Sequence, residues 1–442
     1  MINSDQSYLQ KSLQQFEEHP YPNIPIEVSP KDNPQLLYEG SLVTARYRRD
    51  GRVITDLENR VMLDVACGTG ATTLAMALAN PGAKIIGVDI SPESIKIAEQ
   101  RLKYHGFEEV SFQVLALEEL EQLGLRFDYI GSKDILYLLP DQGAALAQMA
   151  NVLKPDGIIR SNLHSYYQRQ AFYRAQELFK LMGLVEDNPG DMEMTIVREF
   201  FDSLKDGINL KLGAWGNHVD KSNDSVLLSN HLIINDKGFT IPHLFKFIDA
   251  AGLEFIDMVD WRNWNLANLF KEPDNLSSYV ALSLAGLGAQ EQLSLYELVQ
   301  PDKRLLDFWC GHPQAEGKSL ETDWQAVAPE KLRVHFHPCL KKESFCQAVW
   351  EENSLIPLNL GAFFTFLIGK DAWVDRTLIS AVFAPLLEAP RSLAFLAERW
   401  LQICPVNPIT LEPTVREQAV ALLRAAVLDQ EKLGIFLLET GD

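Results

Sequence analysis

The sequence predicts an α/β protein with a seven-stranded sheet, a cap insertion and a mainly helical C-terminal domain. Two observations carry this prediction. Short apolar segments alternate with longer amphipathic ones between residues 61 and 162, which is typical of βαβ units around a parallel sheet. A glycine turn also joins the first apolar segment directly to a helical one, at Gly68 and Gly70.

Five strands and three helices are expected in this region. The strands are Val61–Val65, Lys84–Val88, Val110–Val114, Phe127–Gly131 and Gly157–Ser161. The helices are Ala71–Ala79, Ser91–His105 and Asp141–Leu153. Two later strands, Leu253–Val259 and Ser278–Leu284, would complete the sheet, with a helix at Ile241–Ala251 before them.

The remaining segments define the expected domains. Residues 1–56 form a lead-in segment, with helices expected at Tyr8–Glu18 and Pro34–Arg46. Residues 57–285 form the main domain, and residues 166–235 within it are a cap insertion in which Gly207–Trp215 is a loop or short strand. Residues 286–442 form an accessory domain with helices at Leu378–Trp400 and Thr414–Leu433.

The net charge and the cysteine pattern limit the partners and the compartment that we expect. The 442 residues carry 60 acidic and 40 basic side chains, a formal net charge of −20, which repels nucleic acid and anionic lipid. Neither a leader peptide nor a membrane span is expected. The five scattered cysteines fit a reducing compartment, so we expect a cytoplasmic protein without nucleic-acid or membrane partners. The oligomeric state is left open.

The glycine turn has the features of a nucleoside-binding site. Gly68 and Gly70 allow a tight turn and the close approach of a ligand to a helix N-terminus. Asp64 lies before the turn, and Asp89 ends the next strand, where an acid can accept both hydroxyls of a ribose. A purely structural turn is the alternative. A dinucleotide fingerprint would instead place a third glycine at position 73 and no acid at position 64.

Residues 61–162 resemble the class I S-adenosylmethionine-dependent methyltransferases, which have a Rossmann-like fold. The motif Asp64 to Gly70, the acid Asp89, the strand Phe127–Ile130 and the turn Leu153–Gly157 match theirs in order and spacing. The resemblance implies S-adenosylmethionine as cofactor, with Asp64 orienting its amino group and Asp89 binding its ribose. The cofactor-binding residues expected on this basis are Asp64, Ala66, Gly68, Gly70, Asp89, Ile90, Leu117, Glu118 and Lys133.

One position departs from the pattern of that family. Many members hydrogen-bond the adenine amine with an Asp shortly after the third strand, where this chain has Ala116. Glu118, two residues further on, is the candidate substitute, and backbone groups are the alternative.

Residues near the ends of the fourth and fifth strands are the candidates for catalysis. Methyl transfer from a sulfonium depends mainly on alignment and desolvation, but an acceptor that must lose a proton needs a base. Asp134, His164 and Tyr166 are placed there by chain position, and Tyr137 is a further candidate unless it is ordinary core. The segment after the fourth strand lacks the Asn-Pro-Pro-aromatic tetrapeptide of one methyltransferase branch, which disfavours amino-methylation of bases or glutamine by that geometry.

No metal is expected. His335, His337 and Cys339, with Cys310 or Cys346, could form a zinc site, but no C-x-x-C pair occurs and the spacing matches no familiar pattern. A packed cluster is the preferred interpretation.

The predicted function is therefore methyl transfer to a small-molecule or protein side-chain acceptor. A cofactor-binding regulator without catalysis and, more remotely, a dinucleotide-dependent oxidoreductase are the alternatives. The segments Ser161–Tyr166, Phe239–Trp261 and Leu305–Phe308 resemble bacterial methyltransferases that carry a predicted regulatory domain. We expect the acceptor pocket in the cap and the lead-in segment, lined by Trp215, His218, Tyr166, Tyr167, Phe172 and Tyr173, unless these aromatics form the core of the cap.

Overall fold

The structure is a computed structural model that describes Glu17 and residues 20–185, 188–314, 322–351, 356–407 and 410–441. It forms two compact units. Unit 1 comprises Met1–Ser29, Glu58–Ala77 and Gly82–Pro313, and unit 2 comprises Pro30–Leu57, Leu78–Pro81 and Gln314–Asp442. This division differs from the predicted domains, because unit 2 includes residues 30–57 and unit 1 extends well past residue 286.

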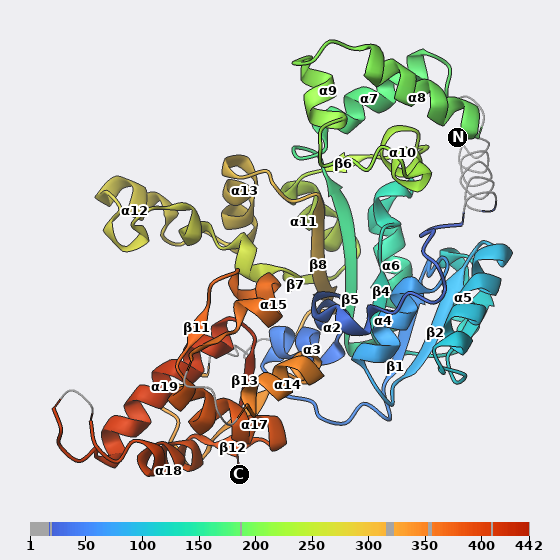
Figure 1. Ribbon diagram of the computed structural model, residues 1–442. Coiled ribbons are helices and arrows are strands. Elements are labelled where there is room, and N and C mark those ends of the chain that lie inside the picture. The colour runs from blue at the N-terminus through green and yellow to red at the C-terminus, as the bar shows by residue number, and fades with distance from the viewer. Residues whose placement is uncertain are drawn as a thin grey trace. The chain divides into compact units, whose positions relative to one another are not determined.

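A central sheet of seven strands organises unit 1, as predicted (Figure 1). Its order is β3-β2-β1-β4-β5-β8-β7, and a two-residue strand, β6, pairs in addition with β5. All neighbours are parallel except β8, which runs antiparallel to both β5 and β7. The strands are β1 (Val61–Val65), β2 (Lys84–Asp89), β3 (Ser111–Val114), β4 (Phe127–Ser132), β5 (Leu153–Ser165), β6 (Gly238–Phe239), β7 (Glu254–Met258) and β8 (Leu305–Gly311).

Helices surround this sheet. The α-helices are α4 (Ala71–Ala79), α5 (Pro92–Tyr104), α6 (Gln142–Val152), α11 (Ile241–Ala250), α12 (Ser278–Leu284) and α13 (Ala289–Val299). The 3-10 helices are η2 (Leu117–Leu123), η3 (Leu136–Leu138), η4 (Trp261–Trp264), η5 (Leu266–Leu269) and η6 (Pro273–Asn275). Side chains of α6, α11 and α13 form one buried core with alternate residues of the strands, such as Leu63 and Val65 of β1.

The predicted secondary structure is wrong for two segments, Ser278–Leu284 and Gly207–Trp215. Ser278–Leu284 is helix α12 rather than a strand, and Leu305–Gly311, which lies beyond the predicted boundary, supplies the remaining strand. Short apolar runs do not distinguish strand from helix by periodicity, and this one is exposed except at Leu284, whereas β8 is largely buried. The expected loop or strand at Gly207–Trp215 is also wrong, because Asn209–Ala214 is a helix.

The cap insertion is helical and has its own core. It consists of α7 (Gln170–Leu181), α8 (Asp191–Ser203), α9 (Asn209–Ala214) and α10 (Asp224–His231). Phe172, Phe179, Phe201 and Trp215 pack together in a cluster separate from that of the sheet. The cap is therefore a small helical subdomain inserted between β5 and β6.

Unit 2 contains a small antiparallel sheet, β12-β9-β13, a two-stranded sheet, β10-β11, and several helices. Its strands are β9 (Leu332–Phe336), β10 (Leu358–Asn359), β11 (Trp373–Val374), β12 (Arg391–Ser392) and β13 (Phe436–Thr440). Its helices are η1 (Pro30–Asp32), α2 (Pro34–Glu39), α3 (Leu42–Asp50), η7 (Pro338–Leu340), α14 (Glu343–Val349), α15 (Gly361–Ile368), α16 (Arg376–Leu378), the π-helix η8 (Ile379–Phe383), α17 (Ala384–Glu388), α18 (Leu393–Ile403) and α19 (Arg416–Lys432).

The predicted helix Leu378–Trp400 is interrupted. Ala389 is extended, with φ −159° and ψ 160°, because the proline that follows it disfavours helical backbone, and β12 then intervenes before α18. The predicted helix Tyr8–Glu18 lies outside the described residues except for Glu17. Within the described part of the chain, no helix has the length and apolar character needed to cross a membrane.

Candidate functional site

Asp64 lies on the β1 face opposite the main core, where alternation along the strand directs it toward α4. It pairs in register with Gly87 of β2 and Gly131 of β4, so both neighbouring positions lack a side chain. Its carboxylate accepts hydrogen bonds from Thr72 Oγ1 at 2.8 Å and Thr73 Oγ1 at 2.6 Å. The side chain is almost fully buried, and this burial raises its pKa from 3.8 to about 6 against the lowering effect of the two hydroxyls.

The turn after β1 requires left-handed backbone at alternate residues. Ala66, Gly68 and Gly70 have φ values of 55°, 50° and 78°. A Cβ on Gly70 would lie 2.9 Å from Ala98 of α5, and a Cβ on Gly68 would collide with the carbonyl oxygen of Tyr21. The glycines therefore serve helix packing and the close passage of residue 21, in addition to any ligand.

Asp89 lies at the end of β2 and holds the glycine turn. One carboxylate oxygen accepts the Gly68 N–H at 2.9 Å, and the other accepts the Ser91 N–H at 2.9 Å. Burial raises its pKa, although the backbone donors oppose that shift. Beside it, the apolar side chains of Ile90 and Val114 are 36% and 52% exposed, which leaves a surface that could contact a planar ring.

The other expected cofactor residues flank the same edge of the sheet. Leu117 and Glu118 begin η2 after β3, and Glu118 is exposed. Lys133 follows β4, and its charge is one of the influences that lower the pKa of Asp64, although burial outweighs them.

A segment of the lead-in, residues 20–26, runs across the glycine turn. Thr69 donates its N–H to Tyr21 O at 3.1 Å and its hydroxyl to Pro22 O at 2.8 Å. The buried guanidinium of Arg101 then donates to three carbonyl oxygens, those of Thr69, Ile24 and Pro25, at 2.6–2.9 Å. Arg101 therefore ties this segment to α5 and to the turn.

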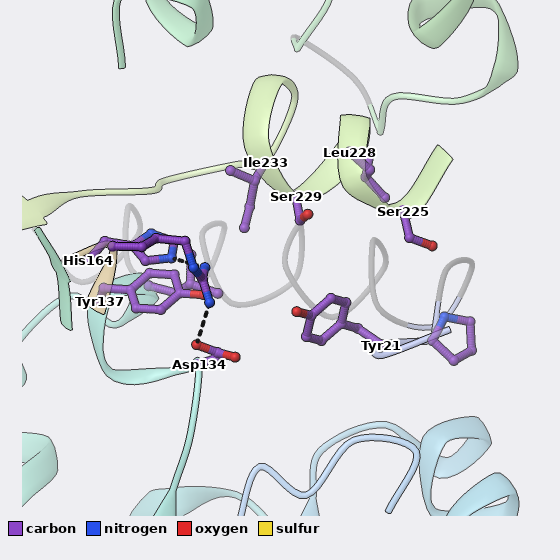
Figure 2. A pocket seen from close by; sticks show the side chains of 11 residues that line it. Tyr21, Asp134, Tyr137, His164, Ser225, Leu228, Ser229 and Ile233 are labelled. Carbon is purple, nitrogen blue, oxygen red and sulfur yellow. Dashed lines mark hydrogen bonds and ion pairs between the residues drawn. The ribbon is translucent and has the colours of Figure 1, made fainter. Parts of the chain in front are cut away.

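A cavity lies beside this edge, at the ends of β4 and β5. It encloses about 620 Å³, counting the part open to solvent. Figure 2 shows α10 side chains on one side and Tyr21, Asp134 and the Tyr137–His164 pair on the other. The lining residues are Pro20, Tyr21, Asp134, Tyr137, Leu138, His164, Ser225, Leu228, Ser229, Ile233 and Arg304.

His164 is the best-defined polar group of the cavity. Its ring stacks on Tyr137 at a centroid distance of 3.6 Å. Nδ1 lies 2.6 Å from the Asp236 carboxylate. On the cavity side, Nε2 lies 3.1 Å from Nη1 of Arg304 (Figure 2). Burial lowers the pKa of His164 to about 4 although Asp236 opposes the shift, so the ring is neutral at pH 7.

Asp134 occupies an unusual backbone conformation, with φ 59°. Asn162 holds it there by accepting its N–H at 3.0 Å and donating to its carboxylate at 3.3 Å. The same carboxylate lies 3.9 Å from Nη2 of Arg304. Arg304 thus lies between Asp134 and His164, with its side chain 47% exposed.

Comparisons with known proteins relate part of the chain to methyltransferases. A family profile described as a methyltransferase domain matches residues 56–221. An uncharacterised protein of Synechococcus sp. is 26% identical over 302 residues, covering 67% of this chain and 70% of the relative. The ubiquinone biosynthesis O-methyltransferase of Paracidovorax citrulli is 30% identical over 105 residues, covering 24% of this chain and 43% of the relative, so the match spans less than half of that protein.

The structure of PKMT2 from Rickettsia typhi in complex with AdoHcy shares the fold. Its TM-score is 0.59 at 14% identity, over 95% of this chain and 77% of that one. Residues 56–221 are therefore similar to methyltransferase domains, and the chain shares its fold with that structure. The AdoHcy in that structure is the demethylated form of S-adenosylmethionine, the methyl donor predicted from this sequence.

The buried carboxyl of Asp64 suits such a donor. Asp64 accepts hydrogen bonds from two neutral threonine hydroxyls, and the charge of Lys133 acts on it as well. The ammonium group of the cofactor would add a positive charge that favours the ionised carboxylate. The residues present therefore fit the donor.

Two residues that line the cavity, Arg304 and Tyr21, and one that contacts His164, Asp236, were missed from the sequence. Arg304 precedes β8, and the antiparallel pairing of β8 with β5 brings it beside His164. Asp236 precedes β6, whose Gly238 pairs with His164. Tyr21 comes from the lead-in segment, which was expected to contribute to the pocket without any single residue being named.

Several expected lining residues lie elsewhere. Tyr166 is 46% exposed and is not part of the cavity lining, and Trp215 and Phe172 belong to the core of the cap. Of the expected catalytic residues, the structure brings Asp134 and His164 together and leaves Tyr166 apart.

The histidines considered for zinc have other partners in unit 2. His335 Nε2 lies 2.7 Å from Glu439, and His337 Nε2 lies 2.9 Å from the Thr44 hydroxyl. No cluster of three or more potential metal ligands occurs among the residues that the structure describes.

Proposed function

We propose that this protein is a methyltransferase that acts on an acceptor bound in the cavity between α10 and the ends of β4 and β5. One observation carries the proposal: Tyr21 joins the two halves of the site. Its backbone oxygen accepts the Thr69 N–H in the cofactor turn, and its ring lines the cavity. Ligands of open α/β sheets bind at the carboxyl ends of the strands, where both halves lie.

The cofactor half comprises residues at the ends of β1, β2 and β3. Asp64 would bind the ammonium group, the turn at Ala66, Gly68 and Gly70 would lie against the methionine part, and Asp89 would accept the ribose hydroxyls. Each Asp89 oxygen retains a lone pair beyond its backbone hydrogen bond. Ile90, Leu117 and Glu118 would contact the adenine, and Lys133 would lie near the carboxylate. When bound, S-adenosylmethionine supplies an electrophilic methyl group.

The acceptor half combines aromatic, aliphatic and charged groups. Such a mixed lining can bind a small molecule or a protein side chain, the two classes expected from the sequence. Asp134 and His164 are the groups that could contact the acceptor. Tyr166, which the sequence placed with them, is not part of the proposed site.

Calorimetric titration of AdoHcy into the full chain tests the cofactor half. We expect Asp89→Ala to weaken binding about tenfold to a hundredfold, because each charge-assisted hydrogen bond contributes about 1.5–3 kcal/mol. Glu99→Ala, which removes an exposed acid of α5, is the matched control and should bind normally. An unchanged dissociation constant in Asp89→Ala would remove this residue from the site.

Transfer of label from S-adenosylmethionine tests the acceptor half. We expect turnover on an acceptor class present in cell extract or in a panel of phenols, alcohols and amines. Binding of AdoHcy without any turnover would instead favour a regulator that binds the cofactor.

A further inference from the structure

The partners of His164 define its protonation state. Asp236 is a carboxylate, which accepts hydrogen bonds, so Nδ1 must carry the proton that joins them at 2.6 Å. The Arg304 guanidinium has only donors, so Nε2 must present its lone pair at 3.1 Å. The ring is therefore held as the Nδ1–H tautomer, with the unprotonated Nε2 facing Arg304, which lines the cavity.

Asp236 is fixed by groups of the cap. Its second oxygen accepts hydrogen bonds from Arg169 Nη2 and Gln176 Nε2, both at 3.0 Å. Arg169 is anchored in turn by Asn230 of α10 at 3.0 Å, and the side chains of Asp236 and Arg169 are 0% and 1% exposed. The hydrogen bond from His164 and the charge of Arg169 lower the pKa of Asp236, outweighing burial, which would raise it. Its carboxylate is thus ionised and cannot readily turn away.

Building on the proposed function, we propose that the acceptor is an oxygen nucleophile, a phenol, enol or alcohol, whose proton passes to Nε2 of His164. Asp236 is then a positioning residue that maintains the tautomer. Arg304 donates to the acceptor oxygen as that oxygen gains negative charge. Because Arg304 covers Nε2, the hydroxyl reaches it when the half-exposed guanidinium shifts toward Asp134, 3.9 Å away.

The step balances in atoms and charge. The acceptor O–H bond breaks and its proton moves to Nε2, while the oxygen electron pair forms the new bond to the methyl carbon. The carbon–sulfur bond breaks with its electron pair left on sulfur, so the sulfonium becomes a neutral thioether. The positive charge moves to the imidazolium, where Asp236 stabilises it until the proton passes to water.

The charges around His164 favour oxygen over nitrogen. An amine enters as an ammonium ion at neutral pH, and the Arg304 guanidinium beside Nε2 would repel it. Asp134, whose carboxylate lies 3.9 Å from Nη2 of the same guanidinium, offsets part of that repulsion. A neutral hydroxyl meets no such penalty, and the same guanidinium stabilises the oxygen as it loses its proton.

Asp236→Asn tests the positioning role of Asp236 most directly. The donors Arg169 and Gln176 fix how the new amide is oriented toward His164. Arg169 and Gln176 both need an acceptor at the second oxygen position, so the amide oxygen takes that place. The amide NH₂ then faces Nδ1 and forces its lone pair there, which moves the proton to Nε2.

Nitrogen-15 NMR of the histidines in the full chain with bound AdoHcy tests this tautomer without any acceptor. We expect Nδ1–H for His164 in the wild type and Nε2–H in Asp236→Asn. Asp206→Asn, a fully exposed acid of the cap, is the matched control and should leave the signals unchanged. An Nε2–H wild type, or an Nδ1–H ring retained in Asp236→Asn, overturns the positioning role.

The label-transfer panel tests the acceptor class. We expect O-methylated products, with kcat about 100-fold or more lower in Asp236→Asn and the KM for S-adenosylmethionine unchanged, as for loss of a general base. Products methylated only on nitrogen overturn the oxygen assignment but leave the proposed function standing. The absence of turnover on every class, with AdoHcy bound, contradicts the proposed function itself.

Discussion

Replacing Asp64 by asparagine should stabilise the free protein and weaken cofactor binding. Asparagine has nearly the same shape, and its oxygen can still accept the Thr72 and Thr73 hydroxyls. The variant therefore removes the buried charge and leaves the packing in place. The structure thus predicts opposite effects on stability and on function at one position.

The magnitude follows from the pKa of Asp64. It is raised from 3.8 to about 6 in the folded protein, so the folded state keeps its proton over a pH range in which the unfolded chain has lost it. Stability is then greatest below pH 3.8 and falls as pH rises to about 6. A difference of about two pKa units corresponds to about 3 kcal/mol, which the ionised carboxyl costs above pH 6.

Urea denaturation of the cofactor-free chain at several pH values measures this difference. Asp64→Asn should exceed the wild type by up to about 3 kcal/mol at pH 8, and the excess should shrink toward pH 4. AdoHcy affinity of the wild type should fall about tenfold per pH unit below pH 6, because binding needs the carboxylate, and that dependence should disappear in the variant. A variant less stable than the wild type at pH 8 would refute the reasoning.

Three further changes probe the turn and the segment across it. Gly68→Ala should lower the thermal midpoint more than Gly51→Ala, because both glycines have positive φ but only the Cβ at position 68 meets another atom within 4 Å; equal shifts would contradict this contact. Arg101→Met should speed proteolysis between residues 20 and 26, since three hydrogen bonds to backbone carbonyls are lost, and unchanged cleavage would show that they contribute little. Ala66→Gly should raise the unfolding free energy by up to about 1 kcal/mol by relieving a φ of 55°, and a loss of stability would mean that chain entropy outweighs this strain.

Local patterns were sufficient to predict where the proposed cofactor-binding residues lie. Asp64, Gly68 and Asp89 lie within one βαβ unit, where strand alternation and the glycine turn determine their positions from nearby sequence alone. The five strands predicted in that region are all present, with ends shifted by a few residues.

The acceptor half depends on contacts between distant residues. Arg304 reaches His164 across 140 positions, and Asp236 reaches it across 72. Both are delivered by pairing to β5, by β8 in the first case and by the two-residue β6 in the second. Periodicity does not predict which strands pair. The apolar run at Ser278–Leu284 was therefore predicted as the last strand of the sheet in place of β8. No local sequence pattern therefore indicated that Arg304 or Asp236 would lie beside His164.

The central claim is that the acceptor binds in the cavity between α10 and the ends of β4 and β5. Methyl transfer by Ser229→Trp tests it most directly, since Ser229 lines the cavity from α10 and an indole there would fill it. Ser203→Trp, on the exposed surface of the cap, is the matched control. With labelled S-adenosylmethionine and the acceptor found in the panel, the account predicts that Ser229→Trp binds AdoHcy with the wild-type dissociation constant and loses transfer, whereas Ser203→Trp retains both. Wild-type transfer by a folded Ser229→Trp variant would contradict the account, because the acceptor would then bind outside this cavity.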